Sequence, residues 1–303
     1  MSSAPAEATG RVYDLGFRRY EGPREGRRRA VLAVYEDGLR TTMGLGRGGR
    51  AKVVPWLFVG ASLIPALVMA LIAGAVDRMA PGFNAANDLP SHAGYYALAS
   101  IVLLVFVAVI GPELFCPDRR DGTISLYLVR PLTATDYAAA RWAALVTFTV
   151  AAAWLPQIVL LAGLVLGAPD PVAYLGDHWL DIPRFLLAGA ALALYFASFA
   201  TLVASHTTRR AYAAAFMVGL FVVSGAVVGS VVDVLSLGTA RWLALLSLLD
   251  LPLYMNDLVF GGKPTAGTTA GEHLPAAIQV GWYLLVCSLA TLLALRRYRR
   301  LST

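Results

Sequence analysis

The chain of 303 residues is 58% hydrophobic and only 15% charged, whereas ordinary soluble domains are roughly 45–50% apolar and about 25% charged. This composition excludes an ordinary soluble domain and indicates an all-α integral membrane protein, because long apolar runs cross a bilayer as helices. The net charge of +6 comes from arginines that lie beside apolar segments, so we expect membrane lipid and no nucleic acid as a partner.

The N-terminal segment, residues 1–52, is predicted to stay in the cytoplasm. Its first ten residues have no apolar core behind a basic start, so no cleavable signal peptide is expected. Further on, apolar side chains recur at helical spacing among charged ones, which predicts an amphipathic helix lying in the membrane interface. The residues assigned to this helix are Arg28, Val31, Val34, Tyr35, Leu39 and Met43.

Six later segments are apolar enough to cross a membrane. A hydrocarbon core about 30 Å thick needs about 20 residues of helix, and every segment reaches that length. The predicted spans are residues 53–76, 95–115, 138–166, 185–205, 212–235 and 276–295. Residues 53–295 therefore form a six-span domain, and residues 296–303 form a basic tail.

The distribution of positive charge predicts which side each loop occupies. Cytoplasmic loops are enriched in lysine and arginine. Of the 25 such residues, with Arg141 taken as cytoplasmic, only Arg78, Arg184, Arg241 and Lys263 fall in the predicted outer segments. The pattern predicts both termini in the cytoplasm and a multi-pass protein of the cell inner membrane.

The predicted spans contain few ionisable residues and no catalytic motif. Glu113 and Asp233 lie near span ends and Arg184 lies just before a span, where a charge can reach the interface or cap a helix. We find no HExxH, no GxSxG and no phosphate-binding loop, and the two cysteines have neither a CxxC pattern nor a histidine companion. We therefore expect no enzyme, metal or cofactor in this chain, and any transport energy should come from elsewhere.

The insert between the second and third spans, residues 116–133, is charged at its start and then apolar. We expect Pro117 to end the second helix, Thr123 to cap a short helix and Pro131 to stop it. Gly122 suits a turn whose backbone angle other residues resist. The apolar side chains Ile124 and Tyr127 leave two interpretations open: a docking knob for a soluble partner, or a loop resting on lipid.

A longer string, from Glu113 through Asp121-Gly122-Thr123 and Arg130-Pro131 to Arg141, resembles the loop after the second span of ABC-2-type permeases. In that family this loop forms the coupling helix that fits a cleft on a separate ATPase subunit. Ala134 departs from the pattern, since many relatives have an arginine there. The resemblance implies that the ATPase contact comprises Asp118, Arg119, Arg120, Asp121, Gly122, Thr123, Ile124, Leu126 and Tyr127.

Two other segments fit the same resemblance. The amphipathic helix would border the ATPase subunit, and the stretch from Tyr13 to Arg29 looks like a leader of some bacterial relatives, with a polybasic lipid anchor as the alternative. Between the fifth and sixth spans, the apolar run 242–249 is too short to cross, and Asp250 with Pro252 should end it. Similar permeases carry re-entrant or interfacial outer helices there.

The resemblance implies the permease subunit of an ATP-driven exporter. Two permease subunits, identical or different, would form the pathway, and two cytoplasmic ATPase subunits would bind ATP and magnesium. The alternatives are a self-sufficient secondary transporter or channel, or a membrane scaffold without transport. Apolar spans suit a lipid-like or amphipathic cargo, but neither its identity nor the direction of transport follows from any residue.

Overall fold

The computed structural model describes residues 22, 25–45, 48–79, 91–128, 131–234, 242–261 and 274–301. Within these ranges every regular element is a helix, which confirms the all-α prediction. In chain order the elements are α1 (Gly26–Thr42), α2 (Gly49–Met79), α3 (His92–Arg120), α4 (Ile124–Leu128), α5 (Ala134–Gly167), α6 (Pro171–Asp177), α7 (Asp181–Ala204), α8 (Arg210–Val234), the short 3₁₀ turn η2 (Ala244–Leu246), α10 (Leu251–Phe260) and α11 (Ala276–Leu301).

Among the described residues, six helices are long and apolar enough to cross a membrane, namely α2, α3, α5, α7, α8 and α11. They coincide with the six predicted spans, so the protein has the character of a multi-pass membrane protein. Several helices continue beyond the predicted limits. The 34 residues of α5 correspond to about 51 Å at 1.5 Å per residue, which exceeds a hydrocarbon core of about 30 Å. Parts of α5 must therefore project from the bilayer.

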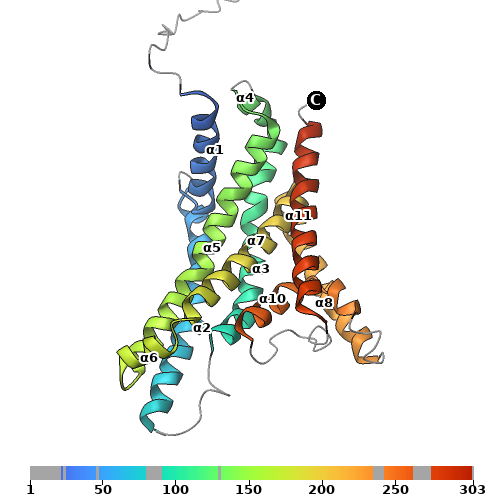
Figure 1. The fold of residues 1–303 in the computed structure, drawn as a ribbon. Helices are drawn as coiled ribbons and strands as arrows, with labels where there is room; N and C mark the ends of the chain where they lie inside the picture. The colour runs from blue at the N-terminus through green and yellow to red at the C-terminus, as the bar shows by residue number, and fades with distance from the viewer. Residues whose placement is uncertain are drawn as a thin grey trace, which may run out of the picture.

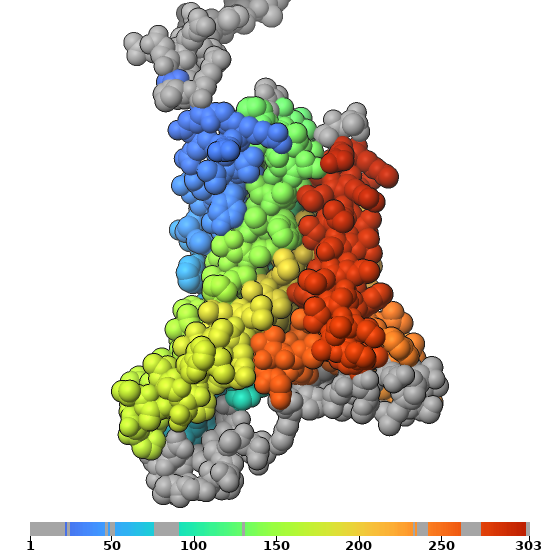
Figure 2. All heavy atoms as spheres, viewed as in Figure 1, coloured from blue at the N-terminus to red at the C-terminus, as the bar shows by residue number. Residues whose placement is uncertain are grey.

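The elements outside the spans divide between the two ends of the bundle. Figure 1 shows α1, α4 and the C-terminal end of α11 at one end, with α6 and α10 toward the other. The space-filling view places the same blue, green and red segments together at one end (Figure 2). We call the first of these the α4 end. An even number of crossings explains why α1 and the end of α11 lie on the same side.

Helices α3 and α7 form the centre of the bundle. In each, 67% of the most apolar stretch is buried, and large aromatic side chains such as Phe106 and Tyr195 fill the space between neighbouring helices. By contrast, only 17% of the corresponding stretch of α8 is buried. Helix α8 packs on α3 and α7, and the other described residues leave most of its apolar surface uncovered.

Small residues let α2 and α5 approach closely. A Cβ atom added to Gly163 would lie 2.4 Å from the Cβ atom of Ala70, and one added to Gly167 would lie 3.3 Å from the Cα atom of Gly74. Close backbone approach through small residues is a common basis of helix packing in membranes, where no hydrophobic force between helices assists.

Two predicted helix boundaries are wrong, and a proline is involved in each. Pro117 does not end the second spanning helix, because α3 continues to Arg120 and the carbonyl of Pro117 accepts a hydrogen bond from the N–H of Asp121. Pro252 does not end a helix either. It lies in the first turn of α10, where a missing N–H costs nothing.

Helix α10 packs into the bundle through α3, α7 and α11. The hydroxyl of Ser247 donates to the carboxylate of Asp250 at 2.6 Å, and the amide of Asn256 donates to the carbonyl of Ala93 at 3.3 Å. Helical structure is therefore present between the fifth and sixth spans, and its re-entrant or interfacial position stays a prediction. Most of the stretch from Tyr13 to Arg29 lies outside the described residues.

Candidate functional site at the α4 end

The turn before α4 depends on a glycine and a threonine. Gly122 has φ of +70°, a left-handed conformation that residues with a side chain rarely adopt, and this confirms the prediction for that position. Thr123 does not cap α4 as predicted. Its hydroxyl donates backward to the carbonyl and carboxylate oxygens of Asp118, at 3.3 and 3.1 Å. The turn is thus tied to α3.

The five residues of α4 have an outer and an inner side. Leu126 is 69% exposed, whereas Ile124, Tyr127 and Leu128 are half-buried and pack against the core. The predicted apolar anchors are therefore not equivalent. Leu126 alone among the apolar side chains of α4 points largely to the outside, and Tyr127 belongs to the interior of the bundle.

Beneath α4 lies Arg141 of α5, whose side chain is only 4% exposed. One guanidinium nitrogen, Nη2, lies 2.8 Å from a carboxylate oxygen of Asp37 in α1 and 3.2 Å from one of Asp118 in α3. The same nitrogen donates to the hydroxyl of Tyr127 in α4 at 3.2 Å. One side chain therefore links four helices.

Aromatic rings surround this guanidinium. Its carbon lies 5.6 Å from the ring centre of Tyr137 and 5.9 Å from that of Tyr127, within the range of cation–π attraction. The hydroxyl of Tyr137 donates to Asp118, and its ring also contacts that of Tyr298 in α11. We call Asp37, Asp118, Tyr127, Tyr137 and Arg141 the Arg141 cluster.

The energetics of the Arg141 cluster follow from burial. A buried charge costs several kcal/mol unless partners compensate it, so removing one partner is far more harmful than the pair is favourable. Arg141 Nε has no hydrogen-bond acceptor among the described residues, so Nη2 carries the polar contacts described above. Burial, followed by the charge of Asp118, raises the pKa of Tyr127 above its ordinary value.

Helix α1 runs beside α5 rather than across the end of the bundle (Figure 1). Its apolar face packs within the chain: Val34 is buried, and Val31, Tyr35, Leu39 and Met43 are half-buried against the core. A place for this helix in the membrane interface stays a prediction. Arg28 is exposed. Gly38 permits the contact, because a Cβ atom there would lie 2.7 Å from the Cβ atom of Ala144.

Polar contacts fix the register of α1 on α5. The guanidinium of Arg27 donates two hydrogen bonds of 2.9 Å to Asp136, and the hydroxyl of Tyr35 donates to Thr147 at 3.0 Å. Together with the contact between Asp37 and Arg141, they hold α1 along the first turns of α5. The position of α1 is therefore coupled to the cluster beneath α4.

The remaining predicted contact residues separate into two groups. Arg119 turns inward, where its Nη1 donates to the carbonyls of Ala204 and Thr207 at 3.0 and 3.1 Å. Arg120 and Asp121 are exposed and pair with each other at 2.9 Å. The hydrogen bond from Arg120 lowers the pKa of the Asp121 carboxyl. Among the predicted contact residues, the Arg120–Asp121 pair is the exposed polar part and Leu126 is the exposed apolar side chain.

Sequence reasoning missed the central role of Arg141 and did not assign Tyr137 or Asp37 to a site. Arg141 was counted with the cytoplasmic arginines although it lies inside the predicted span 138–166. A single arginine among apolar residues at the start of a span was the available signal, because such a charge needs a partner. The partner Asp37 could not be inferred, since it lies more than a hundred residues away.

A second charged contact at the α4 end joins α3 to α8. Arg210 Nη1 lies 2.5 Å from both carboxylate oxygens of Glu113, and the two side chains are 43% and 31% exposed. Of the other charges predicted near span ends, Arg184 pairs with Asp181 at 3.2 Å. The side chain of Asp233 lies outside the described residues.

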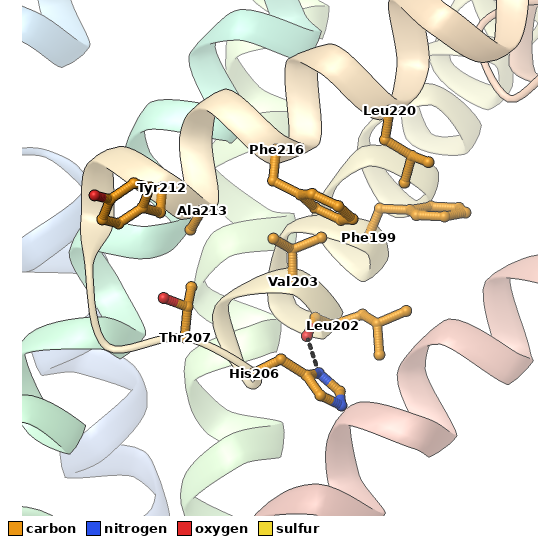
Figure 3. Close-up of a pocket in the computed structure, with 9 residues that line it drawn as sticks. All are labelled: Phe199, Leu202, Val203, His206, Thr207, Tyr212, Ala213, Phe216 and Leu220. Atoms are coloured by element: carbon orange, nitrogen blue, oxygen red, sulfur yellow. Dashed lines mark hydrogen bonds between the residues drawn. The ribbon is translucent and has the colours of Figure 1, made fainter.

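An apolar groove of about 500 Å³ lies between α7 and α8. Figure 3 shows Phe199 and Val203 of α7 facing Phe216 and Leu220 of α8, with His206 just after the end of α7. The ring nitrogen Nδ1 of His206 lies 3.0 Å from the carbonyl of Leu202.

No protein-family model and no curated protein matches the chain. The structure provides a short exposed helix, α4, which a buried arginine connects to three other helices, α1, α3 and α5.

Proposed function

We propose that this protein is the membrane-spanning permease subunit of an ATP-driven exporter. Two cytoplasmic ATPase subunits, which bind ATP and magnesium, would engage the α4 end, and a second permease subunit, identical or different, would complete the pathway. Both termini would lie in the cytoplasm and the protein in the inner membrane. The resemblance of residues 113–141 to ABC-2-type permeases motivates the proposal.

The observation that supports the proposal best is the way in which α4 is bonded to the helices beneath it. Leu126 is exposed at the outside of the helix, while Tyr127 and the turn at Thr123 are bonded to Arg141 and Asp118 beneath it. A partner that pushes on Leu126 would displace α4 together with α1, α3 and α5. A loop resting on lipid has no need of such a connection.

The arrangement of the ends supports the proposed orientation. Helix α1, helix α4 and the arginine-rich end of α11 lie at the same end of the bundle (Figure 1). Positively charged segments favour the cytoplasmic side. A soluble ATPase subunit would therefore meet α1 and α4 together, and the exposed Arg120–Asp121 pair would form part of the rim of that contact.

Two matched substitutions test the proposal, Leu126→Asp in α4 and Val172→Asp in α6. Both residues are exposed apolar side chains on short helices, 69% and 82% exposed, but they lie at opposite ends of the bundle. An interface anchor typically contributes about 2 kcal/mol or more, which is roughly thirtyfold in affinity. Leu126→Asp should therefore lose a co-purifying ATPase subunit and its ATP turnover, while Val172→Asp keeps both.

The assay uses the full-length protein purified from the membranes of its own cell. A stoichiometric subunit carrying a phosphate-binding loop should accompany the wild type. Its absence would contradict the exporter proposal and favour a self-sufficient transporter, a channel or a scaffold. If the subunit is present and Leu126→Asp retains it with full ATP turnover, α4 is not the contact.

A further inference from the structure

A second cleft at the α4 end lies between α2 and α8, which both pack against α3. It has a volume of about 390 Å³, within the range of about 300–1,000 Å³ typical of ligand sites. The end of α1, at Thr41 and Gly44, closes one side. The cleft is separate from the Arg141 cluster, and it shares only Arg120 and Asp121, at its mouth, with the proposed rim of the ATPase contact.

The cleft changes from apolar to charged along α3. Val109 and Ile110 line its deeper part together with Val54 of α2, while Arg120 lies at its mouth. The eleven residue-to-residue steps from Val109 to Arg120 correspond to about 16 Å of helix. A molecule that fills the cleft must therefore carry an apolar part toward the middle of the bilayer and a charged part toward the α4 end.

The charges at the mouth are balanced. Two guanidinium groups, Arg120 and Arg210, face two carboxylates, Asp121 and Glu113, as ion pairs of 2.9 and 2.5 Å. Partly exposed pairs of this kind contribute little to stability, so a ligand can replace one partner at small cost. An anion alone would meet both carboxylates, whereas a zwitterion can place each of its charges against the opposite one.

We propose that this cleft binds a zwitterionic phospholipid with an amine headgroup, taken from the leaflet at the α4 end. Its phosphate contacts Arg210 and Arg120, its ammonium group contacts Glu113, and its acyl chains lie against Val54 and Ile110 and leave between α2 and α8. The proposal requires only that the six helices span a membrane. It does not rest on the exporter function and survives the failure of that proposal.

Native mass spectrometry of the full-length, delipidated protein in detergent tests the site. The probes are phosphatidylethanolamine and phosphatidylglycerol with identical acyl chains. Because only phosphatidylethanolamine offers an ammonium group that can donate a charge-assisted hydrogen bond to Glu113, we expect the wild type to bind it about tenfold more tightly. Glu113→Gln should abolish this preference, and Arg210→Gln should weaken both lipids. Arg27→Gln, another paired arginine at the same end, should change neither.

A second variant fills the cleft without altering its charges. Val54→Trp should lower the affinity for both lipids, provided that size-exclusion profiles and thermal unfolding match the wild type. Equal binding of both lipids by the wild type, or a preference that survives Glu113→Gln, overturns the proposal. Glycerophosphoethanolamine, which lacks acyl chains, distinguishes a soluble ligand: if it binds as tightly as the lipid, the site does not recognise a phospholipid.

Discussion

Helix α3 carries two carboxylates near the α4 end, and each meets an arginine from a different helix. Asp118 meets Arg141 of α5 at 3.2 Å, and Glu113 meets Arg210 of α8 at 2.5 Å. The shorter contact is the more exposed one, since the Arg210 side chain is 43% exposed and that of Arg141 only 4%. Distance and burial therefore rank the two pairs in opposite orders.

Burial decides which pair the fold depends on. Solvent screens a partly exposed pair, and its net contribution is about 0–1 kcal/mol. A buried arginine cannot lose its partners without leaving a desolvated charge. We infer that the Arg141 cluster holds α1, α3, α4 and α5 in one arrangement, whereas the Glu113–Arg210 pair can open without loss of the fold.

The largest difference in the free energy of unfolding is expected between variants of Arg141 and variants of Arg210. Breaking a buried pair typically costs about 3–5 kcal/mol. In the Arg141→Met variant the half-buried Asp118 would keep its hydrogen bond from Tyr137. We therefore expect the lower end of that range, a loss of about 3 kcal/mol in the free energy of unfolding. Arg210→Met should lower it by less than about 1 kcal/mol. Unfolding in mixed detergent micelles, followed by far-UV circular dichroism, measures both.

A double substitution controls for lost packing. Arg141→Met combined with Asp118→Asn should be less destabilising than the sum of the two single changes, because the charge left by the first is removed by the second. Equal losses for Arg141→Met and Arg210→Met would show that burial does not distinguish the pairs.

The next effect concerns the packing that brings Asp37 to Arg141. Gly38→Ala places a Cβ atom 2.7 Å from that of Ala144, so α1 must shift on α5. Overpacking of this kind typically costs about 1–3 kcal/mol, and we expect about 2 kcal/mol here. Gly281→Ala in α11 is the control, since its Cβ atom would meet nothing within 4 Å; replacing a helical glycine there should stabilise slightly.

Limited proteolysis distinguishes this mechanism from a general loss of stability. A displaced α1 should be cleaved faster between residues 25 and 45 in Gly38→Ala while the rest of the chain stays resistant. Unchanged cleavage in this segment, with an unfolding free energy equal to that of the wild type, would show that α1 does not depend on this close contact.

A smaller effect is expected at Gly122, in the turn between α3 and α4. Gly122 connects the helix of Asp118 to the helix of Tyr127 with φ of +70°. Alanine in this conformation costs about 1 kcal/mol, and no neighbouring atom lies within 4 Å of its Cβ atom. Gly122→Ala should therefore lower the free energy of unfolding by about 1 kcal/mol. Gly122→Asn, which tolerates the left-handed region, should recover part of the loss.

The spans could be predicted because a sustained apolar run leaves few alternatives in a bilayer. Their ends could not, because hydropathy reports the apolar part of a helix and not its hydrogen bonds: α3 continues through Pro117 to Arg120 although the sequence turns polar there. The short helix α4 and the special conformation of Gly122 were accessible from the sequence, since turn residues and prolines bracket that segment.

The contacts between the side chains of the site could not be predicted from the sequence. Thr123 offers its hydroxyl to two possible partners, the N-terminus of α4 and Asp118, and only the fold places Asp118 within reach. Likewise, Arg141 finds Asp37 because α1 docks on α5, and no spacing rule predicts a contact between such distant segments. Residue types therefore predicted the shape of the α4 end, but not how its parts are joined.

The smallest effect is expected for a third ion pair at the α4 end, in which the arginine is more exposed than in the other two. Arg27 makes two good hydrogen bonds to Asp136, yet its side chain is 61% exposed. If geometry alone mattered, this pair would be the strongest of the three. Because solvent screens it, Arg27→Gln should change the free energy of unfolding by less than about 0.5 kcal/mol at physiological salt. The difference from the wild type should grow when salt is lowered, whereas the loss in Arg141→Met should stay nearly constant, because a buried pair is screened little. A loss in Arg27→Gln that approached that of Arg141→Met, and that did not respond to salt, would show that α1 is held chiefly by this exposed pair and not by the buried cluster.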